Sequence, residues 1–139
     1  MPKYLGLDLG SRTCGVAISD ISGFLARTYT TIRFKDDDYD SCLTEILAIC
    51  TKERVKDIVL GYPKHMNGDV GIRGQISEDF KAKLEANGDI KVYLWDERLS
   101  TVAADRVMLQ ANMRREYRKE HKDELAAVVI LQNYLDFRR

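Results

Sequence analysis

The sequence predicts an α/β domain built on one mixed sheet of five strands, with helices packed over it. Two observations predict this class. The first 34 residues alternate between apolar and polar side chains, which is typical of strands, and the later residues follow the 3.6-residue period of helices between short apolar runs. With 139 residues, 45% of them apolar and 32% charged, the chain has the size of a single domain spanning residues 1–139.

Three extended runs open the chain and predict an antiparallel meander. Residues 3–9 and 13–19 alternate with period 2 and are joined by a tight connection at 10–12. A third run, 24–34, follows a Ser-Gly turn signal at 22–23. Such short connections are typical of neighbouring antiparallel strands.

Two further strands are predicted among helices. A helix capped by Asp38 or Asp40 comes first, followed by a strand over 57–61 and a glycine-rich loop over 61–71. A second helix then carries the apolar row Ile72, Ile76, Phe80 and Leu84 and leads to a strand over 90–94. Two more helices follow, one from Ser100 or Thr101 and one over 123–137. The last helix contains AAVVIL and is apolar on every side, which predicts an interior position.

Composition narrows the class of protein. Basic and acidic residues balance at 22 each, so the overall charge gives no sign of a nucleic-acid partner. Residues 112–122, however, hold five basic and two acidic side chains, a strip suited to an anionic partner, with a solvated loop as the alternative. The three cysteines lack CxxC spacing and suit core positions, and no signal peptide or membrane-length apolar run is present. We therefore expect a soluble cytoplasmic protein with no membrane partner.

Asp8 is the first candidate functional residue, because it is an acid inside an apolar strand. Alternation places it on the face opposite the leucines, beside Gly6 and Gly10, and the next strand adds Gly15. These small residues predict a surface that a phosphate-bearing ligand can approach closely. A lone buried carboxylate is costly unless it is paired or binds a cation. The alternative is that Asp8 caps a turn or pairs with Arg12.

Further acids stand at the ends of elements. Glu97 follows the strand over 90–94, where sites on sheets commonly lie. Asp123 begins the interior helix, where the helix dipole favours an acid in any case, and spacing alone does not separate Asp123 from Glu124. Three carboxylates suit Mg²⁺ or Mn²⁺ rather than zinc, and such a cluster can hold two ions for phosphodiester cleavage.

The loop over 61–73, GYPKHMNGDVGIR, leads into a helix. Its backbone amides, together with Lys64 and Arg73, can receive phosphates. An ordinary strand-to-helix loop whose glycines only turn the chain is the alternative. His65 and His121 are additional candidates for hydrogen bonding or proton transfer, with solvated histidines as the alternative.

Four segments occur in the order of a known family: GLDLGSRTCGVAISD, LGYPKHMNGDVGIR, DERLST and KDELAAVVILQNYL. Over nearly its entire length the chain resembles the YqgF-type Holliday junction resolvases, also described as pre-16S rRNA nucleases. The resemblance implies an RNase H-like fold and a metal-dependent endonuclease site formed by Asp8, Glu97 and Asp123, which selects Asp123 over Glu124. One departure is Thr13, since the family often has a second basic residue directly after the position of Arg12.

The leading hypothesis is thus a nuclease for structured nucleic acid, either an rRNA precursor trimmed to the 5′ end of 16S rRNA or a branched DNA such as a Holliday junction. Asp8 would bridge two Mg²⁺ or Mn²⁺ ions, completed by Glu97 and Asp123. The phosphate backbone would be contacted by Arg12, Lys64, Arg73, Arg98, Arg114 and Arg115. Ribosomal particles and a homodimer matching a two-fold junction are further expected partners.

Two other classes remain open at this stage. A non-catalytic factor that binds nucleic acid or ribosomes would use the same basic surface. An ATP-binding protein would share the opening G-x-D-x-G strand, which also begins actin-like and sugar-kinase ATPases, although those enclose the nucleotide between two lobes. Metal-independent binding without cleavage would favour the first class, and saturable ATP binding would favour the second.

Overall fold

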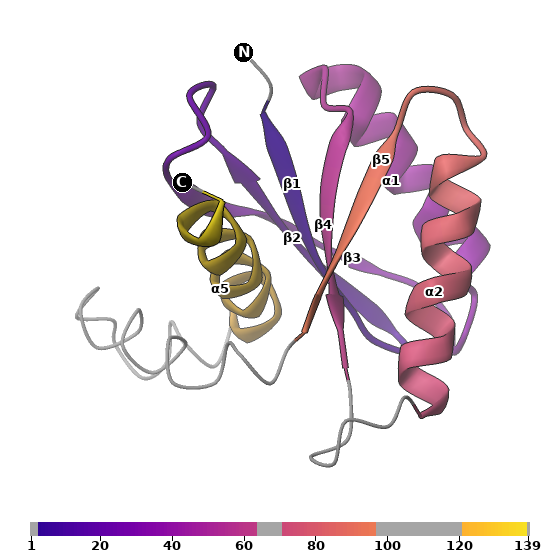
Figure 1. Ribbon diagram of the computed structural model, residues 1–139. Helices are drawn as coiled ribbons and strands as arrows, with labels where there is room; N and C mark the ends of the chain where they lie inside the picture. Colours follow the sequence, from indigo (N-terminus) through magenta and orange to yellow (C-terminus); the bar gives the residue numbers. More distant parts are fainter. Residues whose placement is uncertain (1–2, 64–70, 97–120, 139) are drawn as a thin grey trace.

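In the computed structural model, residues 3–63, 71–96 and 121–138 are described, and their strands form one sheet in the order β3-β2-β1-β4-β5 (Figure 1). The first three strands form an antiparallel meander, and the other two run parallel to β1. The strand bounds are β1 Tyr4–Leu9, β2 Thr13–Ser19, β3 Ala26–Arg33, β4 Asp57–Tyr62 and β5 Lys91–Asp96. The predicted mixed five-stranded sheet is confirmed.

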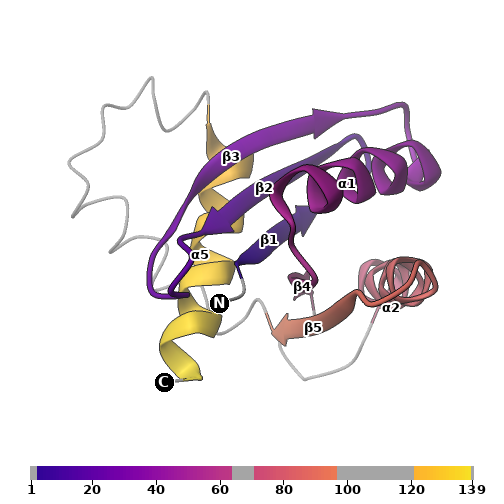
Figure 2. The ribbon, with the colours of Figure 1, turned by 90° about the horizontal axis from the view of Figure 1, so that it is seen from above.

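Helices cover both faces of this sheet. Helices α1 (Tyr39–Glu53) and α2 (Ile72–Glu85) lie on one face, and α5 (Lys122–Phe137) lies on the other (Figure 2). Each face therefore has its own apolar core, and α5 contributes buried side chains over most of its length, as its sequence predicts. The helix predicted from Ser100 or Thr101 lies outside the described residues. None of the described helices is both long enough and apolar enough to cross a membrane.

Two predicted details of the helices have clear outcomes. Asp38, rather than Asp40, caps α1, since its carboxylate accepts from the backbone amide of Ser41 at 3.4 Å. The predicted apolar row of α2 is wrong at Ile72, which is 80% exposed. Packing of α2 begins one turn later, and the buried Ser77 contributes instead by donating its hydroxyl to the Gly61 carbonyl at 3.3 Å.

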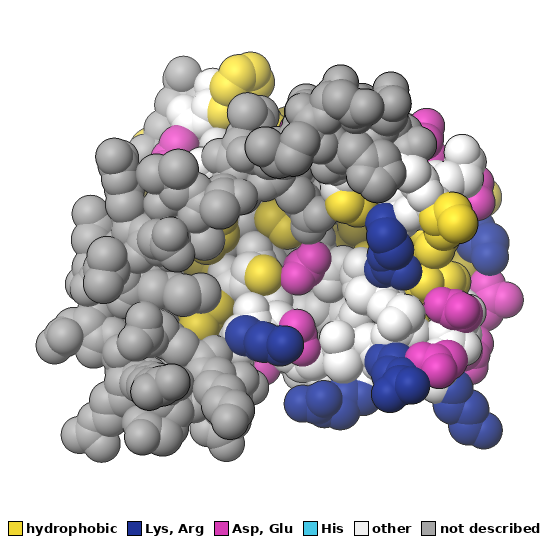
Figure 3. Space-filling model, turned by 90° about the horizontal axis from the view of Figure 1, so that it is seen from below, with side chains coloured by type: hydrophobic (Ala, Val, Ile, Leu, Met, Phe, Trp, Pro, Cys, Tyr) yellow, Lys and Arg dark blue, Asp and Glu magenta, His cyan; other side chains and the backbone are white. Residues whose placement is uncertain are grey.

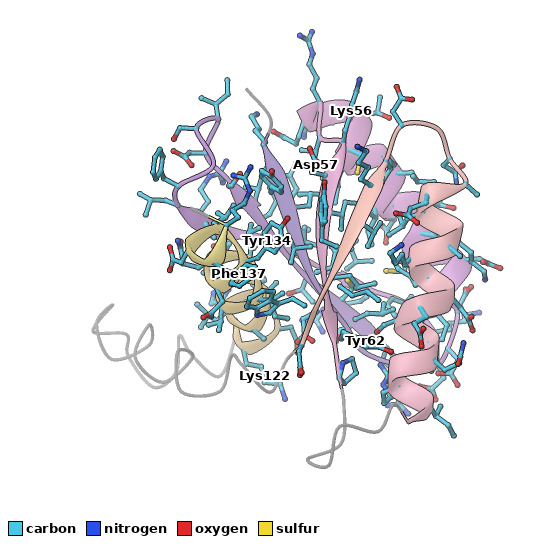
Figure 4. The ribbon with its side chains drawn as sticks, viewed as in Figure 1. Lys56, Asp57, Tyr62, Lys122, Tyr134 and Phe137 are labelled. Atoms are coloured by element: carbon cyan, nitrogen blue, oxygen red, sulfur yellow. The ribbon has the colours of Figure 1, made fainter. Side chains whose placement is uncertain are left out.

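One edge of the sheet brings together the features that matter for function. Strands β1, β4 and β5 are parallel, so their carboxyl ends meet at the same edge, and α5 begins there (Figure 1). Tyr62 at the end of β4 and Lys122 at the start of α5 mark this edge, while Asp57 at the start of β4 marks the opposite one (Figure 4). We call it the carboxyl edge.

The turn between β2 and β3 is held by the carboxylate of Asp20. It accepts from the backbone amides of Phe24 at 2.8 Å and Leu25 at 3.0 Å, and from the Ser22 hydroxyl. The Ser22 hydrogen bond is the largest of the effects that lower the pKa of Asp20 from 3.8 to about 2.

This shift fixes the sign of a pH dependence. A carboxyl group whose pKa is lowered in the folded state stabilises the fold fully above its unfolded pKa, and that contribution is lost as pH falls through about 2. We expect NMR titration to place the Asp20 carboxyl near that value, and Ser22→Ala to move it back toward 3.8. An unchanged Asp20 titration in Ser22→Ala would contradict the assigned cause.

Candidate functional site

Asp8 lies on the face of the sheet that α5 covers, one residue before the end of β1. Its side chain is half-buried, whereas Leu5 and Leu7 are fully buried on the other face, as the alternation predicts. Across the meander, Asp8 pairs with Gly15 of β2, and Gly15 pairs in turn with Thr31 of β3. Paired residues share a face, so these three positions form one row beneath the start of α5.

Helix α5 takes up the surface that the glycines clear. A Cβ atom added at Gly15 would overlap the backbone carbonyl of Asp123, and one added at Gly6 would lie 2.6 Å from the Cβ atom of Leu131. The expectation that a phosphate-bearing ligand occupies this surface is therefore wrong at both glycines. The physical reason is close packing, because only glycine lets a helix backbone approach a strand so closely.

The same packing brings Asp123 toward Asp8. Both acids affect the pKa of one buried thiol, that of Cys14, the residue before Gly15. Its pKa is raised well above the ordinary value, first by a hydrogen bond with Cys42 and by burial, and further by the negative charges of Asp8 and Asp123. Two carboxylates that lie far apart in the sequence thus act on one buried group. The predicted core position of the three cysteines is also confirmed, since Cys14, Cys42 and Cys50 are free and buried.

Glu124, the neighbour of Asp123, has partners of its own. Its Oε1 accepts from the Thr31 hydroxyl at 3.0 Å, and its Oε2 lies 3.4 Å from Nδ1 of His121. Both Asp123 and Glu124 are half-buried in the first turn of α5. Thr31 and its contact with Glu124 were not found from the sequence, because the two residues are 93 positions apart and Thr31 belongs to none of the recognised segments.

Arg12 is exposed at the turn between β1 and β2, where it pairs with Asp36 rather than with Asp8. Nε of Arg12 lies 2.5 Å from Oδ1 of Asp36, and Nη2 lies 3.2 Å from Oδ2, a two-pronged contact. Hydrogen bonding and charge together raise the pKa of Arg12 and lower that of Asp36. The guanidinium already holds a planar anion in the geometry that it would use for a phosphate.

Arg73 lies in the first turn of α2 and connects three elements. Its Nη2 donates to the Leu9 carbonyl at 2.8 Å, and its Nη1 lies 3.1 Å from the Tyr39 hydroxyl oxygen. Leu9 directly follows Asp8, so Arg73 fixes the backbone at the end of β1. The side chain is half-buried at the carboxyl edge.

Five of the predicted site residues, Glu97, Lys64, Arg98, Arg114 and Arg115, lie outside the described residues. Strand β5 ends at Asp96, directly before Glu97 in the sequence. Tyr93 and Trp95 pack on the α5 face and Val92 on the other, so alternation places Asp96 on the face opposite Asp8. Asp96 therefore does not join the row of Asp8.

The donor chemistry at this edge fits a hard divalent cation. Asp8 and Asp123 offer carboxylate oxygens from half-buried positions, and oxygen donors of this kind are the ligands that Mg²⁺ and Mn²⁺ prefer. In the part of the chain that the structure describes, no group of three or more metal-ligating side chains occurs. Viewed from below, the carboxyl edge shows acidic side chains near its middle and basic side chains beside them and along the rim (Figure 3).

Comparisons with known proteins agree on the kind of protein. A sequence model of the RuvX family, described as Holliday junction resolvase, matches residues 2–137. A protein of Staphylococcus aureus strain JH9, named "Putative pre-16S rRNA nuclease", is 47% identical over 135 residues, which cover 96% of this chain and 95% of the relative. Its counterpart in strain N315 gives the same values. Nucleases and resolvases of this kind hydrolyse phosphodiester bonds.

Solved structures show the same fold. T. thermophilus RuvC in complex with Holliday junction substrate superposes with a TM-score of 0.65 at 13% identity, covering 99% of this chain and 96% of that one. The fowlpox virus Holliday junction resolvase gives a TM-score of 0.62 at 13% identity, covering 97% and 99%. The predicted RNase H-like fold is confirmed.

The contact between Gly15 and Asp123 predicts a specific result. Gly15→Ala would force the first turn of α5 away from the sheet, and overpacking of this kind costs about 1–3 kcal/mol. We expect lower stability in urea and faster hydrogen exchange at the Leu125 amide, which bonds the His121 carbonyl in that turn. Backbone amides of α1 serve as the internal control. Wild-type exchange at Leu125 would show that the contact does not position the helix.

Proposed function

The chain belongs to the RuvX family of Holliday junction resolvases, and we propose that it is a metal-dependent endonuclease acting on structured nucleic acid as one domain over residues 1–139. One observation carries the proposal. The close packing of α5 on Gly15 brings Asp123 toward Asp8 at the carboxyl edge, in a fold shared with junction resolvases.

We propose that Asp8, Asp123 and Glu97 would hold the divalent cations, two Mg²⁺ or Mn²⁺ ions, through their carboxylate oxygens. Such ions supply an activated water and stabilise the leaving oxygen when a phosphodiester is cleaved. The chain's own contribution is to present carboxylate oxygens from rigid elements. Asp8 is held by a strand with partners on both sides, and Asp123 by a helix whose backbone rests on the sheet.

Phosphate contacts are proposed for the basic residues around this edge. Arg12 is exposed and is best placed among the described candidates to exchange its carboxylate partner for a phosphate. Arg73 would act at closer range, because it already fixes the carbonyl next to Asp8. Lys64, Arg98, Arg114 and Arg115 complete the proposed set and would extend the contact along the strand, giving salt-sensitive affinity.

The substrate proposed first is precursor 16S rRNA, because the relatives at 47% identity bear that name, whereas the junction-bound resolvase shares 13% identity and shows the fold alone. The protein would then act in the cytoplasm on precursor ribosomal particles. Branched DNA is the alternative substrate, and for it a homodimer would match the symmetry of a four-way junction.

Replacing the central carboxylate tests the mechanism. Asp8→Asn should lower Mg²⁺-dependent cleavage by at least about 100-fold, since metal-assisted charge stabilisation is worth several kcal/mol. Precursor 16S rRNA, a four-way DNA junction and linear duplex DNA are assayed side by side with each protein.

Asp89→Asn is the matched control, because it makes the same change at an exposed acid just before β5, which forms a 3.7 Å ion pair with Lys56. Equal cleavage by wild type and Asp8→Asn would refute the carboxylate mechanism. Binding without cleavage by wild type on every substrate would instead identify a non-catalytic factor.

The Arg12–Asp36 pair gives a second test. If Arg12 contacts phosphate, Asp36 competes with the substrate, and Asp36→Asn should tighten binding by up to about 5-fold at low salt, the strength of one exposed ion pair. The plot of log affinity against log salt concentration should become steeper by the amount that about one additional phosphate contact gives. Fluorescence anisotropy in an Asp8→Asn background separates this binding from cleavage.

Asp40→Asn is the matched control for charge. Asp40 is an exposed acid near the start of α1 that pairs with Lys83 at 3.1 Å, so its loss changes the net charge equally without touching Arg12. The gain from Asp36→Asn should also vanish when Arg12→Gln is added. Equal gains from Asp36→Asn and Asp40→Asn would argue against a phosphate contact at Arg12.

A further inference from the structure

The first turn of α5 crosses a row of three paired residues from three strands. Asp8, Gly15 and Thr31 are direct partners across β1, β2 and β3, and they share the face that α5 covers. Neighbouring strands lie about 4.8 Å apart, so the row spans about 10 Å from Asp8 to Thr31. The helix turn must settle at one place along this row.

Gly15 sets how closely α5 approaches the sheet but leaves its sideways position open. A glycine offers no side chain that would stop a helix from sliding toward β1 or toward β3. Apolar packing of α5 on the sheet is not directional, and the N-cap side chain of His121 makes no capping hydrogen bond in the described structure. A polar tertiary contact in the first turn can therefore select one position along the row.

Glu124 makes that contact. Its carboxylate accepts from the Thr31 hydroxyl at 3.0 Å, and both side chains are half-buried. Thr31 stands on β3, at the end of the row away from Asp8. A second polar contact joins the helix to the same strand two turns later, where Gln132 accepts from the Ala26 amide at 2.9 Å. Helix α5 is thus attached to β3 at two points.

We propose that Glu124 and Thr31 are a positioning pair that fixes the first turn of α5 along the row and thereby sets the separation of Asp123 from Asp8. The proposal rests on the proposed function, because it assigns Asp123 and Asp8 to one metal site. Neither Glu124 nor Thr31 touches the metal or the substrate in this scheme. They act through the backbone of Asp123, as residues outside a metal's direct ligands orient those ligands.

Thr31→Val is the most direct test, because it removes the hydroxyl, keeps the shape of the side chain and leaves every charge in place. Mn²⁺ binding is measured by calorimetry on the full chain, and hydrogen exchange is measured at the Leu125 amide. We expect about 10-fold weaker Mn²⁺ binding, the size usual for residues that orient metal ligands, and faster exchange in the first turn of α5. The Mg²⁺ concentration needed for half-maximal cleavage should rise in parallel.

Two matched variants separate positioning from general stability. Thr31→Ser keeps the hydroxyl and should restore both Mn²⁺ affinity and exchange. Thr30→Val makes the same chemical change one residue earlier on β3, at a position that alternates to the other face, and should leave both unchanged. In a Glu124→Ala background, Thr31→Val should have no further effect on Mn²⁺ affinity, since the partner is already absent.

The outcomes distinguish this proposal from the function on which it rests. Wild-type Mn²⁺ affinity and wild-type exchange in Thr31→Val would overturn the positioning pair while leaving the nuclease intact. Equal losses in Thr31→Val and Thr30→Val would also overturn it, because they would show a general effect on β3. Absence of Mn²⁺ binding by wild type, or equal binding by Asp8→Asn, would overturn the metal site and the positioning pair together.

Discussion

The absence of side chains at Gly6 and Gly15 is the constraint on which the rest of the structure depends. Helix α5 rests directly on the backbone of β1 and β2, so close that a methyl group at either glycine would collide with it. This contact creates the second core of the protein and carries the helix start to the carboxyl edge. The backbone of Asp123 therefore lies over Gly15, the partner of Asp8 across β1 and β2.

Close packing also sets the electrostatics of that edge. Asp8 and Asp123 are both half-buried, and their negative charges reach the Cys14 thiol beneath the sheet surface. In the proposed metal site, a divalent cation would share their oxygens and offset the cost of burying both charges. The two described arginines near this edge differ in how firmly their side chains are held. Arg12 has an exposed and exchangeable partner, whereas Arg73 is committed to the backbone at Leu9.

Local patterns predicted the sheet, its mixed topology and the face on which Asp8 lies, because alternation and period are properties of short segments. They misread Gly6 and Gly15 as space for a ligand, since nothing local shows which helix will cover a strand. They also placed Ile72 in the core, although α2 begins to pack one turn later. The choice between Asp123 and Glu124 came from the family resemblance, and Thr31 was missed because its partner is 93 residues away.

Helix geometry gives the adjacent acids different roles. Consecutive residues of an α-helix point about 100° apart, so Asp123 and Glu124 cannot both face the same strand. Glu124 reaches Thr31 at the β3 end of the row. The backbone of Asp123 lies over Gly15, the partner of Asp8, between the two ends of the row. One acid thus anchors the helix while its neighbour is carried to the proposed metal site, a distinction that spacing in the sequence does not show.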